Sequence, residues 1–123
     1  MQNVQSPRGD DAAIEAELKA KGKTAPRLTP SDLDANIVDT SIVKFIAPSG
    51  QILRWAVLTT KAGFAVAGRP SASVSSENDD AAIGERIAID SARQELWPLM
   101  GYELKCRLAE AARTDAAYNR AEG

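Results

Sequence analysis

The residues of this chain that could do chemistry are basic side chains concentrated in its middle section. Between residues 40 and 76 there are four basic residues and no acidic one, although the whole chain of 123 residues has a net charge of −2. These residues are Lys44, Arg54, Lys61 and Arg69. Arginine presents a rigid fork of N–H donors that matches a phosphate group, so the stretch predicts an anion site. The competing interpretation is that these cations only prevent edge-to-edge pairing of strands.

A second group of polar residues stands where a helix is expected to begin. Asn78 and Asp80 open it and Arg93 lies within it, and the free N–H groups of a helix start attract anions. The acidic pair Asp79–Asp80 opposes an anion there, so an aspartate could instead accept hydrogen bonds from a sugar or a base, as could Asn78. We expect one shared pocket only if a neighbouring chain closes it. The candidate ligand-binding residues are Arg27, Arg54, Arg69, Asn78, Asp80 and Arg93.

The sequence lacks the usual components of an enzyme or a metal site. It contains no histidine, and Cys106 is its one cysteine. Histidine is the commonest general base and metal ligand, and a zinc site needs several such ligands. No P-loop, Gly-x-Ser-x-Gly or Gly-x-Gly-x-x-Gly motif is present. We therefore expect a protein without catalytic residues, metal or cofactor.

Composition places the chain among single-domain globular proteins, with 44% hydrophobic and 26% charged residues. We expect one domain over residues 25–110, a flexible or helical appendage over residues 1–24, and a frayed tail over residues 111–123. No signal peptide or membrane-spanning run is visible, which predicts a location in the cytoplasm and no membrane partner. The slightly negative net charge argues against binding to duplex nucleic acid.

Periodicity and turn residues predict an α+β fold. The N-terminal appendage is either a helix over residues 10–21 or a partly disordered tail. Thr29 before Pro30 predicts the start of a short helix that ends near Ile37. Strands are expected over residues 40–47, 52–60 and 64–68, with a two-residue turn between the last two.

The expected sheet is antiparallel and three-stranded, with C-terminal helices on one face. We predict that the helices cover the face with Leu53, Trp55 and Val57, because that face is the bulkier. The helix over residues 79–97 has a row of residues spaced by four, and its small members permit a close approach to the sheet. The row comprises Gly84, Ala88, Ala92 and Leu96. Pro98 is expected to break the helix. A sheet this small suggests a homo-oligomer, at least a dimer.

Several residues of this region resemble a known family. They are Gly63-Phe64, Gly68, Glu77-Asn78-x-Asp80, Gly84, Ile87-Ala88, Ala92 and Trp97-Pro98-Leu99-x-Gly101-Tyr102-x-Leu104, preceded by Ala25-Pro26-Arg27-Leu28-Thr29-Pro30. This pattern resembles a family of small tailed-phage proteins, gene-product-49-like or gene-66-like, over roughly residues 25–108. The sequence departs from it at Ala62, Arg69 and Asp79, where the family has asparagine, an acidic residue and an aromatic residue.

Some members of this family resemble the Thoeris anti-defence sponges of phages. The resemblance implies a homo-oligomer that binds a cyclic ADP-ribose isomer or a cyclic oligonucleotide without cleaving it. Its arginines would bind the phosphates, and Asn78 and Asp80 the ribose or base. Two alternatives remain: a phage interaction or assembly factor that binds a protein partner, and a phosphodiesterase or hydrolase.

Overall fold

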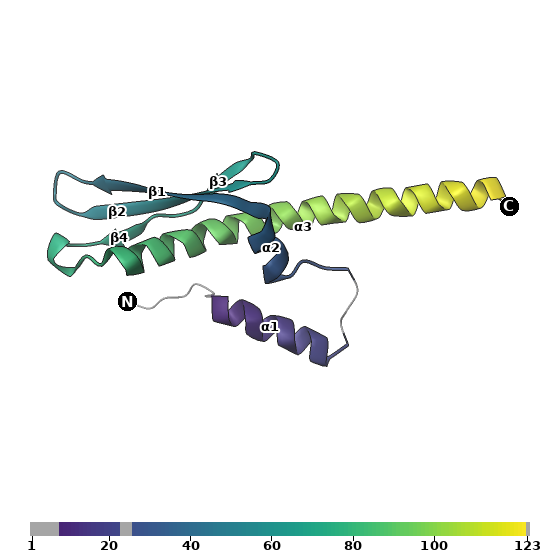
Figure 1. Cartoon of the computed structure of the whole chain (residues 1–123), viewed down its shortest axis with the longest axis horizontal. Coiled ribbons are helices and arrows are strands. Elements are labelled where there is room, and N and C mark those ends of the chain that lie inside the picture. The colour runs from purple at the N-terminus through teal and green to yellow at the C-terminus, as the bar shows by residue number, and fades with distance from the viewer. Residues whose placement is uncertain (1–7, 23–25, 123) are drawn as a thin grey trace.

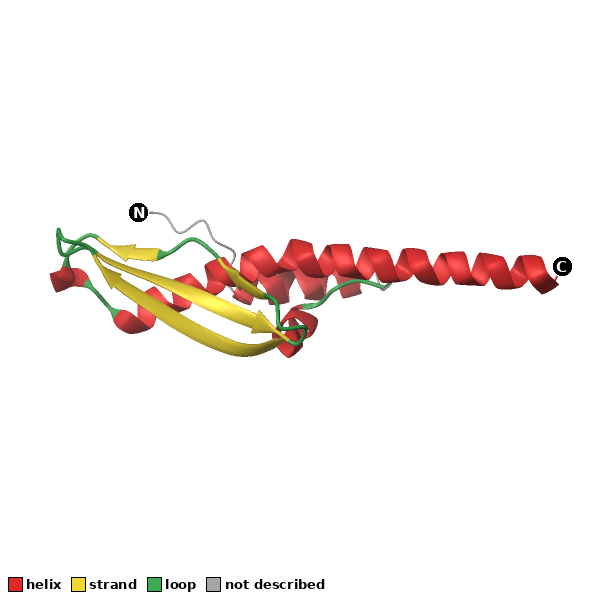
Figure 2. Ribbon diagram, turned by 90° about the horizontal axis from the view of Figure 1, so that it is seen from above, coloured by secondary structure: helices red, strands yellow, loops and turns green. Residues whose placement is uncertain are grey.

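The fold is α+β, with an antiparallel four-stranded sheet and one long helix packed against it (Figures 1 and 2). The structure is a computed structural model that describes residues 8–22 and 26–122. The elements are α1 (Arg8–Ala20), α2 (Pro30–Asn36), β1 (Ile37–Ile46), β2 (Ile52–Thr60), β3 (Ala65–Ala67), β4 (Ser71–Ser73), a 3-10 turn (Ser76–Asn78) and α3 (Ala81–Glu122). The predicted fold class is confirmed.

The sheet is built around β2. Along one side β2 pairs with the whole of β1, from Ile37↔Thr60 to Ile46↔Ile52. Along its other side it pairs with β3 near Leu58 and with β4 near Leu53, so two short strands share that edge. The three predicted strands are present. The fourth, β4, was expected to be a loop because its sequence is rich in serine.

The prediction about which face of the sheet is covered was wrong. The side chains of β2 that are buried under α3 are Ile52, Arg54, Ala56, Leu58 and Thr60, and those of Leu53, Trp55, Val57 and Thr59 lie on the opposite face. The row of small residues on α3 explains this choice. Small side chains on the helix require small or flat partners on the sheet, and Ala56 supplies one where Trp55 would not.

The turn between β2 and β3 also differs from the prediction by one residue. The Gly63 N–H donates to the Thr60 carbonyl at 2.9 Å, and the Thr60 N–H donates to the Phe64 carbonyl at 2.9 Å. The loop therefore has three residues, and Gly63 has a φ of 86°, the left-handed conformation that such loops require. Leu58 pairs with Val66 instead of Ala67, which places Val66 on the buried face.

The N-terminal half of α3 covers the sheet closely. Ala88 and Ala92 are fully buried and Leu96 is 2% exposed. The backbone of Gly68 lies against Ser91, since a Cβ built on Gly68 would be 2.4 Å from the Ser91 carbonyl carbon. These contacts confirm that the row of small residues is a packing surface.

The C-terminal half of α3 projects past the end of the sheet (Figure 1). The helix continues through Pro98, where we expected a break. Leu96 and Met100 are buried on either side, so packing offsets the hydrogen bond that proline removes. It also continues to Glu122, which differs from the expectation of a frayed tail over residues 111–123.

Two helices lie near the end of the sheet from which α3 projects. α2 begins after Thr29 as predicted, and its start is a capping box. The Asp32 N–H donates to the Thr29 hydroxyl oxygen, and the Thr29 N–H donates to the Asp32 carboxylate. Leu33 on α2 is fully buried in the core. α1 forms a helix, and its exposed Ile14 shows that it covers little of the core.

Candidate functional site

A basic pocket lies where α2, the β2–β3 turn and α3 meet. Its volume is about 360 Å³, within the size range of small-molecule sites. Its lining residues are Arg27, Leu28, Asp32, Ala35, Asn36, Lys61, Met100, Leu104 and Arg107. Three cations therefore face one carboxylate, in a protein whose net charge is negative.

Backbone contacts fix the position of Lys61 in this pocket. Its N–H donates to the Asn36 carbonyl at 3.0 Å and lies 3.3 Å from the Asn36 Oδ1. The end of α2 is thus tied to the β2–β3 turn. The capping box holds the other end, because the Asp32 Oδ2 accepts from the Thr29 N–H at 3.0 Å. The polar groups of the pocket are consequently carried by short, well-anchored backbone segments.

Arg27 forms another side of the pocket and contacts α1. Its Nη2 donates to the Glu15 Oε2 of α1, and its side chain is 24% exposed. Its Nε atom is buried without a hydrogen-bond partner among the described residues. A buried donor without a partner costs free energy, so a bound anion at this position would gain an additional hydrogen bond.

The lining suits a ligand that carries both phosphate and apolar parts. Arg27, Lys61 and Arg107 can donate to phosphate oxygens, and charge-assisted hydrogen bonds of this kind are the stronger ones. Leu28 and Leu104 provide an apolar wall against which a base or sugar can pack. Of the predicted site residues, only Arg27 lines this pocket.

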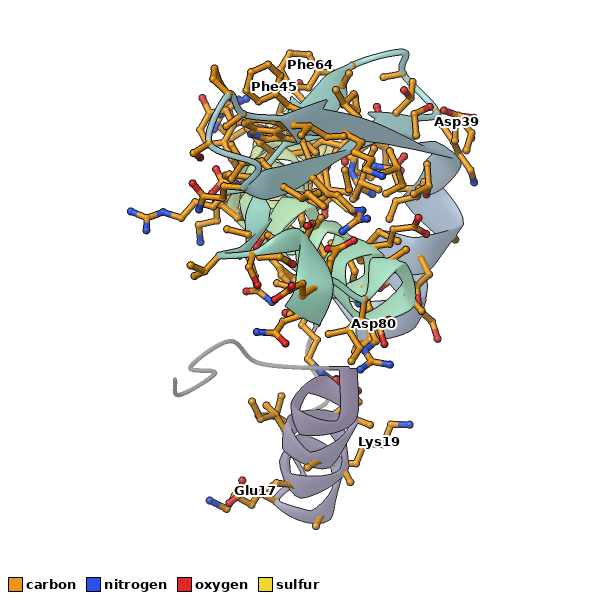
Figure 3. The ribbon with its side chains drawn as sticks, turned by 90° about the vertical axis from the view of Figure 1, so that its left-hand side faces the viewer. Glu17, Lys19, Asp39, Phe45, Phe64 and Asp80 are labelled. Atoms are coloured by element: carbon orange, nitrogen blue, oxygen red, sulfur yellow. The ribbon has the colours of Figure 1, made fainter. Side chains whose placement is uncertain are left out.

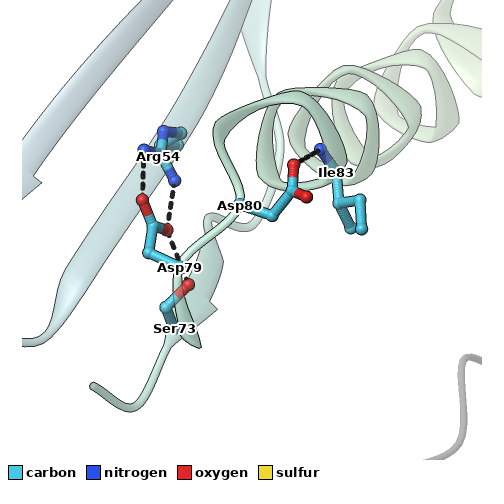
Figure 4. A network of polar contacts seen from close by, with 5 residues as sticks. All are labelled: Arg54, Ser73, Asp79, Asp80 and Ile83. Atoms are coloured by element: carbon cyan, nitrogen blue, oxygen red, sulfur yellow. Dashed lines mark hydrogen bonds and ion pairs between the residues drawn. The ribbon is translucent and has the colours of Figure 1, made fainter. Parts of the chain in front are cut away.

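Arg54 has an intramolecular role instead. Its side chain is 4% exposed, and its Nη1 and Nη2 donate to the two carboxylate oxygens of Asp79 at 2.7 and 2.8 Å (Figure 4). The Ser73 hydroxyl donates to the same carboxylate at 2.7 Å. Gly84 leaves space for the guanidinium, since a Cβ there would lie 2.9 Å from Nη1. This cluster ties the segment before α3 to the sheet.

The ion pair shifts the pKa of both partners. The hydrogen bonds from Arg54, and then that from Ser73, lower the pKa of Asp79 far below its usual range. In return, the hydrogen bond with Asp79 raises the pKa of Arg54. Asp79 therefore remains a carboxylate at any physiological pH.

Arg93 is also directed into the protein. It is 2% exposed and forms an ion pair with Asp34 of α2. This ion pair, in which Arg93 is buried and the Asp34 side chain is 44% exposed, joins α2 to the middle of α3. Like Arg54, Arg93 therefore has a carboxylate partner within the chain, which the sequence could not show because Asp34 is distant from it along the chain.

The other three predicted residues are exposed, and within one chain they do not meet the basic pocket. Arg69 follows β3, Asn78 ends the 3-10 turn, and the Asp80 Oδ1 accepts from the Ile83 N–H at 3.0 Å (Figure 4). Asp80 is thus the cap of α3. About 20 helical residues separate Asp80 from Met100 in the pocket, which corresponds to roughly 30 Å. Arg93 is 2% exposed and offers almost no surface on which a second chain could join it to Asn78 and Asp80.

Most of the residues that line the pocket were not predicted from the sequence. Lys61 was noted as part of the basic stretch, but Asn36 and Arg107 carried no signal. Arg107 lies in the segment that was expected to extend the apolar surface of the helix. Leu104 and Arg107 lie three residues apart and so on one side of a continuous helix. This spacing would have been the one indication of the pocket. Predicting the pocket required knowing that α3 passes through Pro98.

Two searches of the described part of the chain gave negative results. In residues 8–22 and 26–122, no group of three or more histidine, cysteine, aspartate or glutamate side chains is arranged to hold a metal ion. Among the helices of the same residues, none has the length and apolarity needed to cross a membrane.

The comparisons with known proteins identify a phage family. Residues 28–108 match the family described as "Phage protein (N4 Gp49/phage Sf6 gene 66)". The match covers α2, the whole sheet and α3 as far as the last residues of the pocket. No curated protein and no solved structure matches the chain.

Proposed function

Since the chain belongs to the phage protein (N4 Gp49/phage Sf6 gene 66) family, we propose that it is a phage accessory protein that sequesters a cyclic nucleotide. The ligand is a cyclic ADP-ribose isomer or a cyclic oligonucleotide that acts as an immune signal in the host cytoplasm. The protein binds it without cleaving it and so blocks the defence response. The proposal rests on the resemblance to anti-defence sponges and on the basic pocket.

The basic pocket is the observation that carries the proposal. A cyclic nucleotide has negatively charged phosphates, hydroxyl groups and flat bases. The pocket offers three cations for the phosphates, Asn36 and Asp32 for hydroxyl or amine groups, and Leu28 and Leu104 for a base. Arg27 and Arg107 also pair with Glu15 and Glu103, so a bound phosphate would share their guanidinium donors with these carboxylates.

The experiment is to incubate the purified protein with a panel of cyclic nucleotides, remove free ligand, release bound ligand by heat and analyse it by chromatography. Recovery of intact ligand supports sequestration. Recovery of degraded ligand would support a hydrolase instead. If no ligand is retained, the proposed function is wrong.

Variants of the pocket locate the binding site. Loss of one charge-assisted hydrogen bond costs about 1.5–3 kcal/mol, so Lys61→Gln and Arg107→Gln should each weaken binding by about tenfold to a hundredfold. Arg113→Gln is the matched control, because Arg113 is exposed and pairs with the nearby Glu110, as Arg107 does with Glu103, but does not line the pocket. If Lys61→Gln and Arg107→Gln retain as much nucleotide as Arg113→Gln does, the ligand binds outside this pocket.

The alternative function, a phage interaction or assembly factor, also has an observation in its favour. Val43 and Phe45 of β1 are each 50% exposed on the uncovered face of the sheet. Such apolar exposure is typical of a contact surface. Failure to retain any nucleotide, together with binding of a phage protein, would establish this alternative.

A further inference from the structure

The face of the sheet turned away from α3, here called the outer face, is almost free of charge. By strand alternation it carries Asp39, Ser41, Val43, Phe45, Leu53, Trp55, Val57, Thr59, Ala65, Ala67 and Ala72, of which only Asp39 is charged. Figure 3 shows Phe45, at the β1–β2 hairpin end of the sheet, and Phe64, beside the β2–β3 turn at the other end, on the side opposite to the helices. Phe64 is 60% exposed. No described element of the chain covers this surface.

The projecting part of α3 is the second surface without a partner. Residues 105–121, here called the projecting segment, are all exposed. An isolated helix of this length is only marginally stable in water, because most helical stability in proteins comes from packing. A continuous helix at this position therefore suggests that something packs on it.

The sequence of α3 indicates what kind of surface that is. The row of residues spaced by four continues along the whole helix and, because each step of four residues turns it by about 40°, it winds slowly around the helix. Its members are Gly84, Ala88, Ala92, Leu96, Met100, Leu104, Leu108, Ala112 and Ala116. The first five pack toward the sheet and core of their own chain, and the last three are exposed. The projecting segment thus repeats the pattern with which α3 already packs on a sheet.

We propose that two copies of the chain exchange their projecting segments, so that each segment lies on the outer face of the other copy. A two-fold axis perpendicular to α3, near the end of the sheet, relates the copies. Each sheet is then covered by its own α3 on one face and by its partner's α3 on the other. The contact is reciprocal, as a closed dimer requires.

The dimensions of the two surfaces agree. The projecting segment of 17 residues is roughly 26 Å long, and the nine residues of β2 span roughly 30 Å. Three strands are roughly 14 Å wide. With the length of the projecting segment, and with both surfaces of both contacts counted, the exchange buries roughly 1,500 Å², which lies within the range of about 1,200–2,000 Å² for stable complexes. Apart from Asp39 the outer face is uncharged, and it fits the apolar stretch of the projecting segment around Leu108 and Ala112; the flanking Lys105 and Asp115 lie at the margins of that stretch.

Light scattering and substitutions test the exchange. The parent should be a dimer at tens of micromolar, an ordinary concentration for association of this strength. Val43→Asp on the outer face and Leu108→Asp on the projecting segment should each give a monomer with an unchanged circular dichroism spectrum. Ala117→Asp is the matched control, since it lies nine residues from Leu108 and so on the opposite side of the helix. This variant should remain a dimer.

Fluorescence of Trp55 shows which surface is covered. In a Trp97→Phe background Trp55 is the remaining tryptophan. Its emission should shift to longer wavelength on dilution, as the partner's helix leaves the outer face. A monomeric parent, a dimer that survives Val43→Asp or Leu108→Asp, or an emission that does not change while the dimer dissociates would overturn the proposal. None of these outcomes affects the nucleotide experiment, which has its own readout.

Discussion

At the scale of single residues, burial decides what an arginine does. Arg54 on β2 and Arg93 on α3 are both buried, and each has a carboxylate partner within the chain, Asp79 for Arg54 and Asp34 for Arg93. An uncompensated buried charge is strongly destabilising. Arg27 also pairs with Glu15, but its side chain remains 24% exposed at the pocket, so of the three it is the one placed to contact a ligand.

Asp79 should make stability dependent on acid pH. Its pKa is lowered by hydrogen bonds from Arg54 and Ser73. Its contribution is therefore complete above the unfolded-state pKa of about 4 and is lost as the pH falls below it. Thermal unfolding measured between pH 7 and pH 3 should show a steeper fall in Tm for the parent than for Asp79→Asn.

At pH 7 the same Asp79→Asn variant should melt several degrees below the parent, because Arg54 remains buried beside a neutral amide. Parallel Tm curves for the two proteins over the acid range would mean that Asp79 does not hold this ion pair in solution.

At the scale of elements, the distance between α3 and the sheet depends on residues without bulky side chains. Gly68→Ala should cost about 1–3 kcal/mol of unfolding free energy, because the new methyl group would meet the Ser91 backbone, which cannot rotate away. Gly101→Ala is the matched control. No atom lies within 4 Å of its added Cβ, and alanine is favoured over glycine in a helix by up to about 1 kcal/mol.

Urea denaturation of both variants measures these values. If the unfolding free energy changes by the same amount in Gly68→Ala and Gly101→Ala, the close contact between Gly68 and Ser91 of α3 is contradicted.

The sequence predicted elements better than it predicted their orientation. The capping box at Thr29 and the β-branched strands are local signals, and both elements were found. The loop at Gly63 was misjudged by one residue, and because strand side chains alternate, one residue moves Val66 to the other face. The covered face of β2 was misjudged because bulk was taken as the guide, whereas α3 selects Ala56. The pocket could not be predicted, since it forms only where three separate elements meet.

At the scale of the whole molecule, the chain has one covered sheet face, one open sheet face and a helix twice as long as its sheet contact requires. These features are costly for a monomer, which would expose Phe45 to water and leave the end of α3 without packing. Exchange of the projecting segments removes both costs with one contact. The basic pocket lies where the projecting segment begins, so dimerisation and ligand binding would take place on neighbouring surfaces.

Hydrogen exchange should therefore depend on protein concentration in one half of α3 only. Amides of residues 84–98 are covered by the chain's own sheet and should exchange slowly at any concentration. Amides of residues 105–120 should be protected at tens of micromolar, where the partner's sheet covers them, and should exchange rapidly at concentrations low enough to dissociate the dimer. The Leu108→Asp variant should show rapid exchange of the second group at both concentrations. Equal protection of the two halves in a monomeric protein would show that the projecting helix is stable alone and needs no partner.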